Sequence, residues 1–331
     1  MSVLTLDFLN NTTRPKFLKA LKNQIFDRMP AFKIFLMNGR STDATGAYLL
    51  WDVIAKRHAS IGIISGYETL VNQPINPTAQ AQLNYATYYA TLAISIIEEK
   101  RNSGSMEKLL DMVKIQYDNA QSTLREQMYR HWYDSITSVN GINTIVGLGA
   151  SVASTPTNTY ANINRATAGN EYWKNGALAT SITVSDLKDS TTAYYLPSIM
   201  RTAYTTASHD ESPDSIFTTK AVYNIYQDIA QTTNLRFNNE VANLGFGGVE
   251  FGPGITLMFD DYCPDYYMYF LTTKNWDVHV FPGLNFDDDE PGWRLAENQA
   301  AKINHIFWSG QVRCDAPRQQ YVMSGLGRAG A

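Results

Sequence analysis

With 331 residues, 44% of them hydrophobic and 18% charged, the chain is long enough to bury a sizeable core and to form about two globular domains. Its net charge of −4 excludes nucleic-acid binding through the charge of the whole protein and leaves only local basic patches for that purpose. The two cysteines, Cys263 and Cys314, are far apart and have no CxxC partner, so neither a zinc site nor a disulfide framework is indicated, and we expect both thiols to be reduced.

Residues 1–30 contain one such basic patch. Within residues 14–29, apolar side chains recur at steps of three and four and stop before Pro30, which predicts a short amphipathic helix whose basic face is solvated. The apolar residues are Leu18, Leu21, Ile25 and Met29. The basic residues are Arg14, Lys16, Lys19, Lys22 and Arg28. The start of the chain lacks the pattern of a signal peptide, and no apolar run reaches the ~18 residues that span a bilayer, so we expect no export and no membrane.

Residues 47–64 and 81–96 read as two long strands, because β-branched, aromatic and aliphatic residues dominate both. The segment between them is interrupted by Gly66, Pro74 and Pro77, which predicts the tip of an extended hairpin. An isolated hairpin is at best marginally stable in water, so we expect it to lie on another surface. The apolar residues that share one parity of the first strand are Leu49, Trp51, Val53, Ala55, Ala59, Ile61 and Ile63.

From Ser105 to about Ile136 the chain has neither proline nor glycine, and its apolar residues recur with a period near 3.6. This pattern predicts one long amphipathic helix, with Ser105 as its N-cap. The residues of the predicted apolar face are Met106, Leu110, Val113, Tyr117, Ala120, Leu124, Met128, Trp132 and Ile136. A helix of this length among β-rich segments favours a spine across an α+β domain.

Beyond this helix, residues 137–195 are rich in Ser, Thr, Asn and Gly and show few periodic runs. The stretch SPDSIFTTKAVYNIYQDIA then predicts a short strand and a helix that buries Val222, Ile225, Tyr226 and Ile229. The stretches GITLMFDD, YYMYFLTT and WDVHVF are predicted as short strands of an antiparallel sheet.

One polar, aromatic stretch, RATAGNEYWKN at residues 165–175, is a candidate binding site for a sugar or nucleotide, or for another copy of the chain. Its candidate residues are Arg165, Glu171, Trp173 and Lys174. The acidic run Asp287, Asp288, Asp289 and Glu290 is the sharpest chemical candidate, because clustered carboxylates bind hard cations. Consecutive residues cannot all converge on one ion, so an exposed acidic loop is the preferred interpretation.

No other pattern predicts catalysis. The glycines of GFGGVEFGPG lack the spacing of a phosphate-binding loop, and Asp260 and Asp261 are interpreted as turn residues at a strand end. The histidines have no ligand partner at i+2 or i+4 and are expected to be packing or surface residues; they are His58, His131, His209, His279 and His305. We therefore predict no catalytic, cofactor-binding or metal-binding residues.

The ordered segments over residues 166–326 resemble the major capsid proteins of tailed phages, which have the HK97-type fold. The resembling segments are ATAGNEYWKN, SPDSIFTTKAVYNIYQDI, FNNEVANLGF, ITLMFDDYCPDYYMYFLTTKNWDVHVFP and RLAENQAAKINHIFWSGQVRCDAPRQQYVMSGL. Upstream of residue 166 the resemblance is one of pattern only. Some relatives form covalent links through Lys and Asn; Lys56 lies in the predicted hairpin, but no motif identifies it as such a residue.

The resemblance implies an α+β chain divided as follows. Residues 1–45 would be an N-terminal arm and 46–92 an extended hairpin, the E-loop. Residues 93–140 and 265–312 would form a peripheral domain with the spine helix 105–136, and residues 141–264 and 313–331 an axial domain.

The implied function is a shell protein that self-assembles, as hexameric and pentameric capsomers, into the icosahedral or prolate capsid around a double-stranded DNA genome. The expected partners are further copies of the chain, a portal, scaffolding or decoration proteins, and weak non-specific contact with the packaged DNA. The expected location is the virion, after assembly in the host cytoplasm. Two other classes stay open from the residues alone: a metal-assisted hydrolase that uses residues 287–290, and a cellular protein that binds a small ligand.

Overall fold

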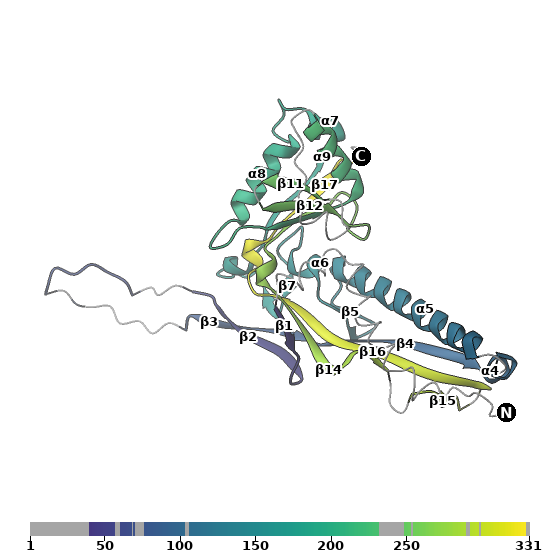
Figure 1. Ribbon diagram of the computed structural model, residues 1–331. Coiled ribbons are helices and arrows are strands. Elements are labelled where there is room, and N and C mark those ends of the chain that lie inside the picture. Colours follow the sequence, from purple (N-terminus) through teal and green to yellow (C-terminus); the bar gives the residue numbers. More distant parts are fainter. Residues whose placement is uncertain are drawn as a thin grey trace.

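A computed structural model describes residues 40–56, 60–67, 69, 76–102, 106–231, 248–252, 254–288, 292–297 and 299–328. These residues form two lobes and a thin projection that leaves the body near their junction (Figure 1). The elongated lobe contains a five-stranded sheet with helices α4 (Ile96–Asn102) and α5 (Met106–Tyr133). The compact lobe contains a six-stranded sheet with helices α7, α8 and α9.

The sheet of the elongated lobe is built around β16 (Ala301–Cys314). This strand pairs antiparallel with β14 (Trp276–Asp288), β4 (Ala86–Ser95) and β15 (Arg294–Leu295), and β1 (Arg40–Asp43) adds in parallel to β14. Along β16, every residue from Trp308 to Val312 is buried. The centre of β16 is therefore the interior of this lobe.

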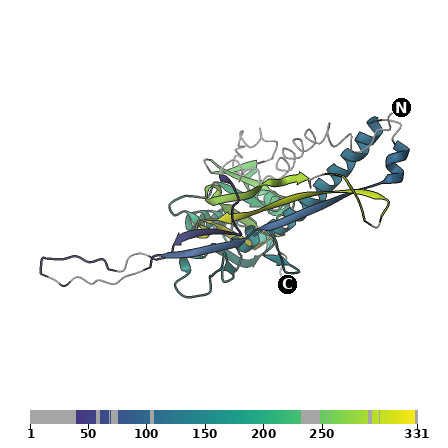
Figure 2. The ribbon, with the colours of Figure 1, turned by 90° about the horizontal axis from the view of Figure 1, so that it is seen from below.

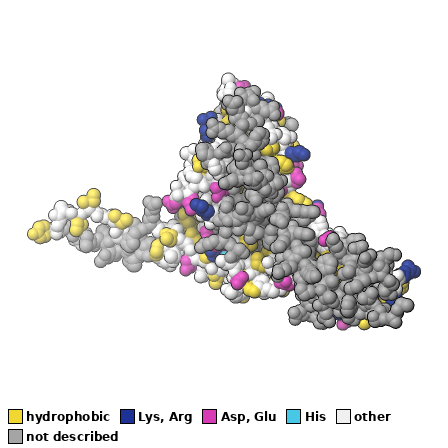
Figure 3. All heavy atoms as spheres, viewed as in Figure 1, with side chains coloured by type: hydrophobic (Ala, Val, Ile, Leu, Met, Phe, Trp, Pro, Cys, Tyr) yellow, Lys and Arg dark blue, Asp and Glu magenta, His cyan; other side chains and the backbone are white. Residues whose placement is uncertain are grey.

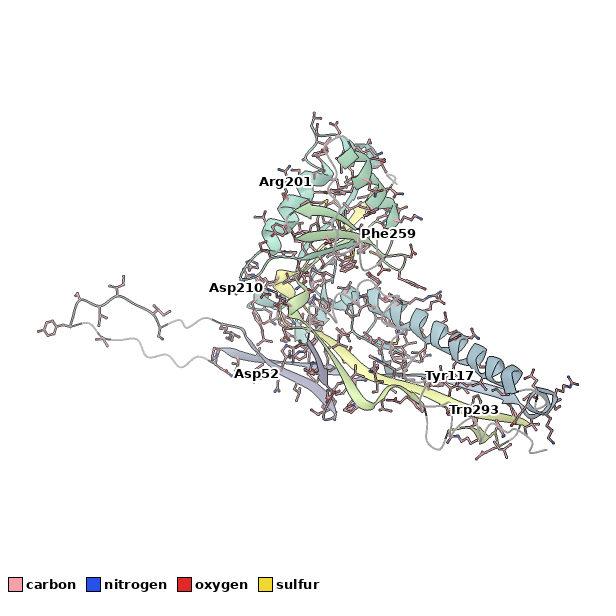
Figure 4. All side chains as sticks on the ribbon, viewed as in Figure 1. Asp52, Tyr117, Arg201, Asp210, Phe259 and Trp293 are labelled. Atoms are coloured by element: carbon pink, nitrogen blue, oxygen red, sulfur yellow. The ribbon has the colours of Figure 1, made fainter. Side chains whose placement is uncertain are left out.

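Helix α5 (Met106–Tyr133) runs along this sheet as the predicted spine. Of the predicted apolar face, Val113, Tyr117, Leu124, Met128 and Trp132 are buried. Asn304 of β16 donates a hydrogen bond to the Tyr117 hydroxyl at 2.9 Å, which ties the helix to the sheet (Figure 4). The helix ends three residues earlier than expected, so Ile136 lies beyond it and is 43% exposed. The predicted N-cap, Ser105, lies outside the described residues.

The sheet of the compact lobe has the order β11-β12-β10-β13-β17-β9. It is mixed, because β10 is parallel to β12 and β9 is parallel to β17. The predicted antiparallel arrangement is therefore wrong in part: β10 lies between two of the expected strands, and WDVHVF belongs to β14 of the other sheet. The strands are β9 (Gly176–Ile182), β10 (Ser215–Thr218), β11 (Gly248–Gly252), β12 (Ile255–Phe259), β13 (Met268–Leu271) and β17 (Tyr321–Leu326).

Both faces of this six-stranded sheet are covered, which explains the nearly continuous apolar runs of its strands. Ile216 of β10 and Phe270 of β13 face one core, while their neighbours Phe217 and Leu271 face the other. Three helices line the first core: α7 (Val184–Lys188), α8 (Leu196–Ala207) and α9 (Lys220–Gln231). The second core is continuous with that of the elongated lobe, so one apolar interior spans the junction.

Short elements fill the junction between the lobes. They are the hairpin of β5 (Ser138–Val139) and β6 (Ile142–Asn143), helix α6 (Leu148–Ser151), the hairpin of β7 (Thr159–Tyr160) and β8 (Ile163–Asn164), and the single turns η1 (Glu171–Trp173), η2 (Thr273–Asn275) and η3 (Pro317–Gln319).

The projection is a hairpin of β2 (Tyr48–Ile54) and β3 (Thr78–Asn84), paired in register from Tyr48↔Asn84 to Ile54↔Thr78. Figure 2 shows it extending away from both lobes. The predicted second strand, 81–96, is divided: β3 pairs with β2, whereas β4 leaves the hairpin after Tyr85 and pairs with β16. Only the first part of that segment therefore belongs to the projection.

Candidate functional site

The paired strands β2 and β3, here named the hairpin root, bury one face against the body. Leu49, Ala81 and Leu83 are buried, and Trp51 and Val53 are partly buried against the same core. The hairpin was expected to lie on another surface, and at Trp51 and Val53 the chain's own body provides part of that surface. The opposite face of β2 is open, with Tyr48, Leu50 and Ile54 exposed.

Trp51 is the main aromatic anchor of the root. Its ring centroid lies 6.5 Å from that of Trp173, and the guanidinium carbon of Arg313 lies 5.5 Å from the Trp51 ring centroid. Asp277, which is buried, holds the Arg313 guanidinium by bonds of 3.0 and 2.5 Å. A cation fixed in this way over an indole ring is attracted by its electron-rich face. Nothing in the sequence pattern linked residue 51 with residue 313.

The stretch 165–175 supports this anchor from within. Arg165 is fully buried and donates to the side-chain oxygens of Asn158 and Asn175, both at 3.2 Å, and to the carbonyl of Ser151 at 2.5 Å. Its guanidinium carbon lies 5.0 Å from the centroid of the Tyr160 ring. Burial lowers the pKa of Arg165 to about 10, which leaves the group charged at neutral pH.

Trp173 is also buried; its indole N–H donates to the Tyr160 carbonyl at 3.1 Å, and the two rings stack. Glu171 is exposed and Lys174 half-buried, so the four predicted residues do not converge. Of the four candidate residues, Arg165 and Trp173 bind other groups of the chain, and the stretch does not bring all four together into one site.

The far end of the projection is open. Its described residues 60–67, here named the hairpin tip, expose Ile61, Ile63, Ile64 and Tyr67, of which Ile63 is 99% exposed. Figure 3 shows apolar side chains at the end of the projection, away from the rest of the molecule. Isolated exposed apolar residues are ordinary, but several on one thin element mark an interaction surface. Lys56, between root and tip, is exposed.

The acidic run 287–290, the candidate for cation binding, forms no metal site among the described residues. Asp287 and Asp288 continue β14, where the Asp287 carboxylate accepts from the Asn285 amide at 3.2 Å, and Asp289 and Glu290 lie outside the described residues. Within the part of the chain that the structure describes, no three His, Cys, Asp or Glu residues are close enough to hold a metal ion. No described helix is long and apolar enough to cross a membrane.

The histidines are spread over separate elements, as predicted. His131 contacts the Tyr88 hydroxyl, His279 contacts Thr42, and His305 contacts Thr91. His209 lies in a bend, and His58 lies outside the described residues. Both cysteines are buried and free, in agreement with the prediction.

Asp260 is a turn residue, as predicted, and is also buried. Its carboxylate accepts a bond from the amide of Tyr262 at 2.9 Å and one from the hydroxyl of Tyr133, the last residue of α5, at 2.8 Å. Burial raises the pKa of Asp260, and these two bonds offset the increase only in part. The turn after β12 is thereby tied to the end of the spine helix.

A cavity of about 370 Å³ opens beside the hairpin root. Its described lining carries amide, hydroxyl and apolar side chains but no charged ones, and comprises Gln82, Leu83, Asn84, Thr137, Ser138, Asn143, Val146, Thr159, Tyr160, Ala161 and Asn162. The Ala161 carbonyl, in the turn between β7 and β8, accepts a bond from the Gln82 amide at 3.0 Å. This bond fixes one edge of β3 to the body.

No protein-family model and no curated protein matches the sequence. Solved structures match the fold. The cyanophage A-1(L) capsid asymmetric unit has a TM-score of 0.61 at 13% identity, covering 91% of this chain and 94% of that chain. The capsid of Myoviridae phage XM1 has a TM-score of 0.56 at 10% identity, covering 88% and 91%. The holo-SrpI encapsulin complex from Synechococcus elongatus has a TM-score of 0.52 at 9% identity, covering 98% and 96%.

The chain has the HK97-type capsid fold. The predicted α+β class is therefore confirmed. The coverage of about nine tenths of the chain extends the match upstream of residue 166, where the sequence resembled the family by pattern only.

Proposed function

We propose that this chain is the major capsid protein of a tailed double-stranded DNA phage, a structural subunit without catalytic function. The observation that carries the proposal is the hairpin, whose root is packed on the body while its tip holds exposed apolar side chains away from it. In a chain with the HK97-type capsid fold, such a tip is suited to pack against a further copy of the chain.

The driving force for assembly is the burial of the tip. Each Å² of apolar surface that a neighbour covers contributes about 25 cal/mol, less the cost of ordering the hairpin. Tip and receiving surface are different patches of one chain, so the contact is heterologous, and repeated contacts close into a ring when the rotation allows it. Hexameric and pentameric capsomers are the rings that we propose.

We further propose a division of the chain that follows the sheets. The N-terminal arm ends at residue 39 rather than at residue 45, because β1 belongs to the five-stranded sheet. The E-loop ends at Asn84 rather than at residue 92, because β4 belongs to the five-stranded sheet. The elongated lobe is the peripheral domain. The compact lobe is the axial domain and includes β13, which the sequence-based division had placed in the peripheral domain.

The remaining partners follow from the shell function. We propose a portal and scaffolding or decoration proteins as accessory partners, weak non-specific contact with packaged DNA, assembly in the host cytoplasm and a final location in the virion. Because an encapsulin has the same fold, the fold alone does not distinguish a phage capsid from an encapsulin-like shell. DNA inside particles from infected cells would identify a capsid.

The test is to express the chain and examine it by electron microscopy and sedimentation. We expect regular closed particles from the wild type. The triple variant Ile61→Ser, Ile63→Ser and Tyr67→Ser removes the exposed apolar surface of the tip and should stay as small soluble species with an unchanged melting temperature, because these side chains have few contacts in the subunit.

The matched control is Ile142→Ser, which replaces an exposed apolar residue on the short β5–β6 hairpin and should leave particles intact. A wild-type chain that sediments only as a monomer would rule out the shell function. Normal particles from the triple variant would retain the shell function and exclude the tip as its contact.

A further inference from the structure

Gln311, in the buried centre of β16, uses the full bonding capacity of its amide. The side-chain oxygen accepts from the backbone amides of Val146 at 2.8 Å and Val312 at 3.0 Å. The side-chain nitrogen donates to the carbonyls of Asn84 at 2.6 Å and Thr144 at 3.3 Å. A carboxamide has two acceptor sites and two N–H groups, so every site is occupied.

The partners of Gln311 belong to segments far apart in the chain. Asn84 is the last residue of β3, where the chain leaves the hairpin root and enters the body. Thr144 and Val146 lie in the segment that follows β6 and precedes α6. One side chain of β16 therefore joins the exit of the hairpin to the segment that passes the end of the spine helix.

That segment is itself fixed to α5. The Ile145 amide donates to the Tyr88 hydroxyl at 3.0 Å, and the same hydroxyl lies 2.8 Å from Nδ1 of His131 in the last turns of the helix. At Gly147, an added Cβ would lie 2.0 Å from the Trp132 carbonyl oxygen, so only glycine allows this approach. The segment cannot move independently of the helix end.

We propose that Gln311 is a positioning residue that sets the direction in which the hairpin leaves the body. Apolar contacts at the root, such as those of Trp51 and Leu83, are non-directional and tolerate sliding, whereas a buried amide with four satisfied bonds holds its partners in one arrangement. A small rotation at the root moves the distant tip much further. Any effect of Gln311 on the shape of an assembled shell rests on the proposed shell function, whereas its effect on the direction of the hairpin does not.

The direction can be measured on unassembled subunits. Spin labels at Ile63→Cys in the tip and Arg201→Cys on α8 report their distance by pulsed electron paramagnetic resonance, while the two native cysteines are buried. In Gln311→Leu we expect a shifted or broadened distance distribution and about tenfold faster hydrogen exchange at the Val146 amide, which loses its acceptor. Where wild-type subunits form shells, the variant should form particles of altered or mixed diameter.

The matched control is Asn304→Leu. This buried amide lies on the same strand but donates to Tyr117 of α5, away from the hairpin root. It should lower the melting temperature without changing the tip distance or the particle diameter. A distance distribution in Gln311→Leu identical to that of the wild type would overturn the proposal. Absence of shells from the wild type would overturn the proposed function alone, because the distance measurement would still decide the role of Gln311.

Should Gln311→Leu fail to fold, Gln311→Glu provides the second measurement. A neutral carboxyl keeps one O–H donor for the Asn84 or Thr144 carbonyl, whereas the carboxylate has none and would face those oxygens with a negative charge. Because burial raises the pKa of the introduced carboxyl, we expect the wild-type tip distance at acidic pH and a displaced or broadened one at an alkaline pH at which that carboxyl is ionised. A distribution independent of pH and equal to the wild type would contradict the positioning role.

Discussion

At the scale of single residues, the junction between the two lobes depends on buried polar groups that the chain satisfies by itself. Arg165, Asn175, Asp260 and Gln311 are all buried and all hydrogen bonded. Burying an amide such as that of Asn175 or Gln311 without partners would cost about 2 to 7 kcal/mol, and burying an unpaired charge would cost more. Because their partners are mostly backbone groups at fixed positions, they specify one arrangement of the segments that meet there.

Asp260 gives this junction a pH dependence. Its pKa is raised by burial, so the folded state binds a proton more tightly than the unfolded state, in which the carboxyl titrates at about 3.9. The contribution to stability is therefore fully present below the unfolded pKa and is lost as the pH rises through the folded pKa. We predict that Asp260→Asn removes this part of the decline in the free energy of unfolding above about pH 4.

The measurement is urea unfolding of wild type and variant across the acidic range. Asp210→Asn, at an exposed position that does not contribute to the raised pKa of Asp260, is the control and should keep the wild-type dependence of the free energy of unfolding on pH. Some dependence of the free energy of unfolding on pH should remain in Asp260→Asn, because burial also raises the pKa of Asp214. Parallel stability curves for Asp260→Asn and wild type would count against the assignment to Asp260.

The sequence predicted the burial of apolar residues such as Trp132, but not the internal roles of the buried polar residues Arg165 and Gln311. The burial of Trp132 followed from helical periodicity alone. Arg165 lies in a stretch as polar as any ligand site, and no local pattern distinguishes an arginine that binds a ligand from one that binds the chain's own carbonyls. Gln311 was missed for the same reason, since its partners lie in segments distant in the sequence.

At the scale of elements, helix α5 connects the two lobes, because its last turns pack against both of them. Trp132 is fully buried, and its ring centroid lies 5.5 Å from that of Trp276 at the start of β14. Tyr133 contacts Asp260 of the compact lobe, and Tyr129 stacks on Tyr262 with ring centroids 4.6 Å apart. The last turns of α5 therefore contact β14 of the five-stranded sheet and the turn that follows β12 of the six-stranded sheet.

We predict that Trp132→Ala lowers the free energy of unfolding by about 3 to 5 kcal/mol, the range for truncating a large buried aromatic ring. Chemical denaturation monitored by far-ultraviolet circular dichroism measures the change. Ile136→Ala, half-exposed beyond the helix, should stay within about 0.5 kcal/mol of wild type. Equal stabilities of Trp132→Ala and wild type would contradict the packing described.

The elements illustrate what local sequence determines. The spine helix and the hairpin with its exposed tip followed from periodicity and from Gly and Pro positions. The division between β3 and β4 did not, because apolar alternation continues across Tyr85. The strand that pairs with β4 is also distant in the sequence: Thr87 of β4 contacts Ser309 of β16, which lies 222 positions further along the chain. Strand partners, unlike strand character, depend on the assembled sheet.

At the scale of the whole molecule, the charge balance limits contact with nucleic acid. A net charge of −4 opposes tight binding, since affinity for DNA arises from phosphate contacts that release counterions. We predict weak, sequence-independent binding of double-stranded DNA that is lost as salt rises toward about 0.2 M. Fluorescence anisotropy at several salt concentrations measures it.

The residues expected to carry this contact, Arg14, Lys16, Lys19 and Lys22, lie outside the described residues. Changing all four to glutamine should abolish the residual binding without a change in thermal stability. The control exchanges Lys188 and Arg201 of the compact lobe for glutamine and should leave binding unchanged. Sequence-specific binding that persists at high salt would refute the prediction.

The pairing of β1 with β14 constrains the order in which the protein becomes native. Thr42 contacts His279 across 237 positions of sequence, and the central strand β16 ends only at Cys314. During synthesis, the five-stranded sheet therefore cannot close until β16 has left the ribosome, and closing such long loops makes folding slow. The hairpin with its exposed isoleucines emerges long before β16, so nascent chains present an aggregation-prone segment until that strand is available.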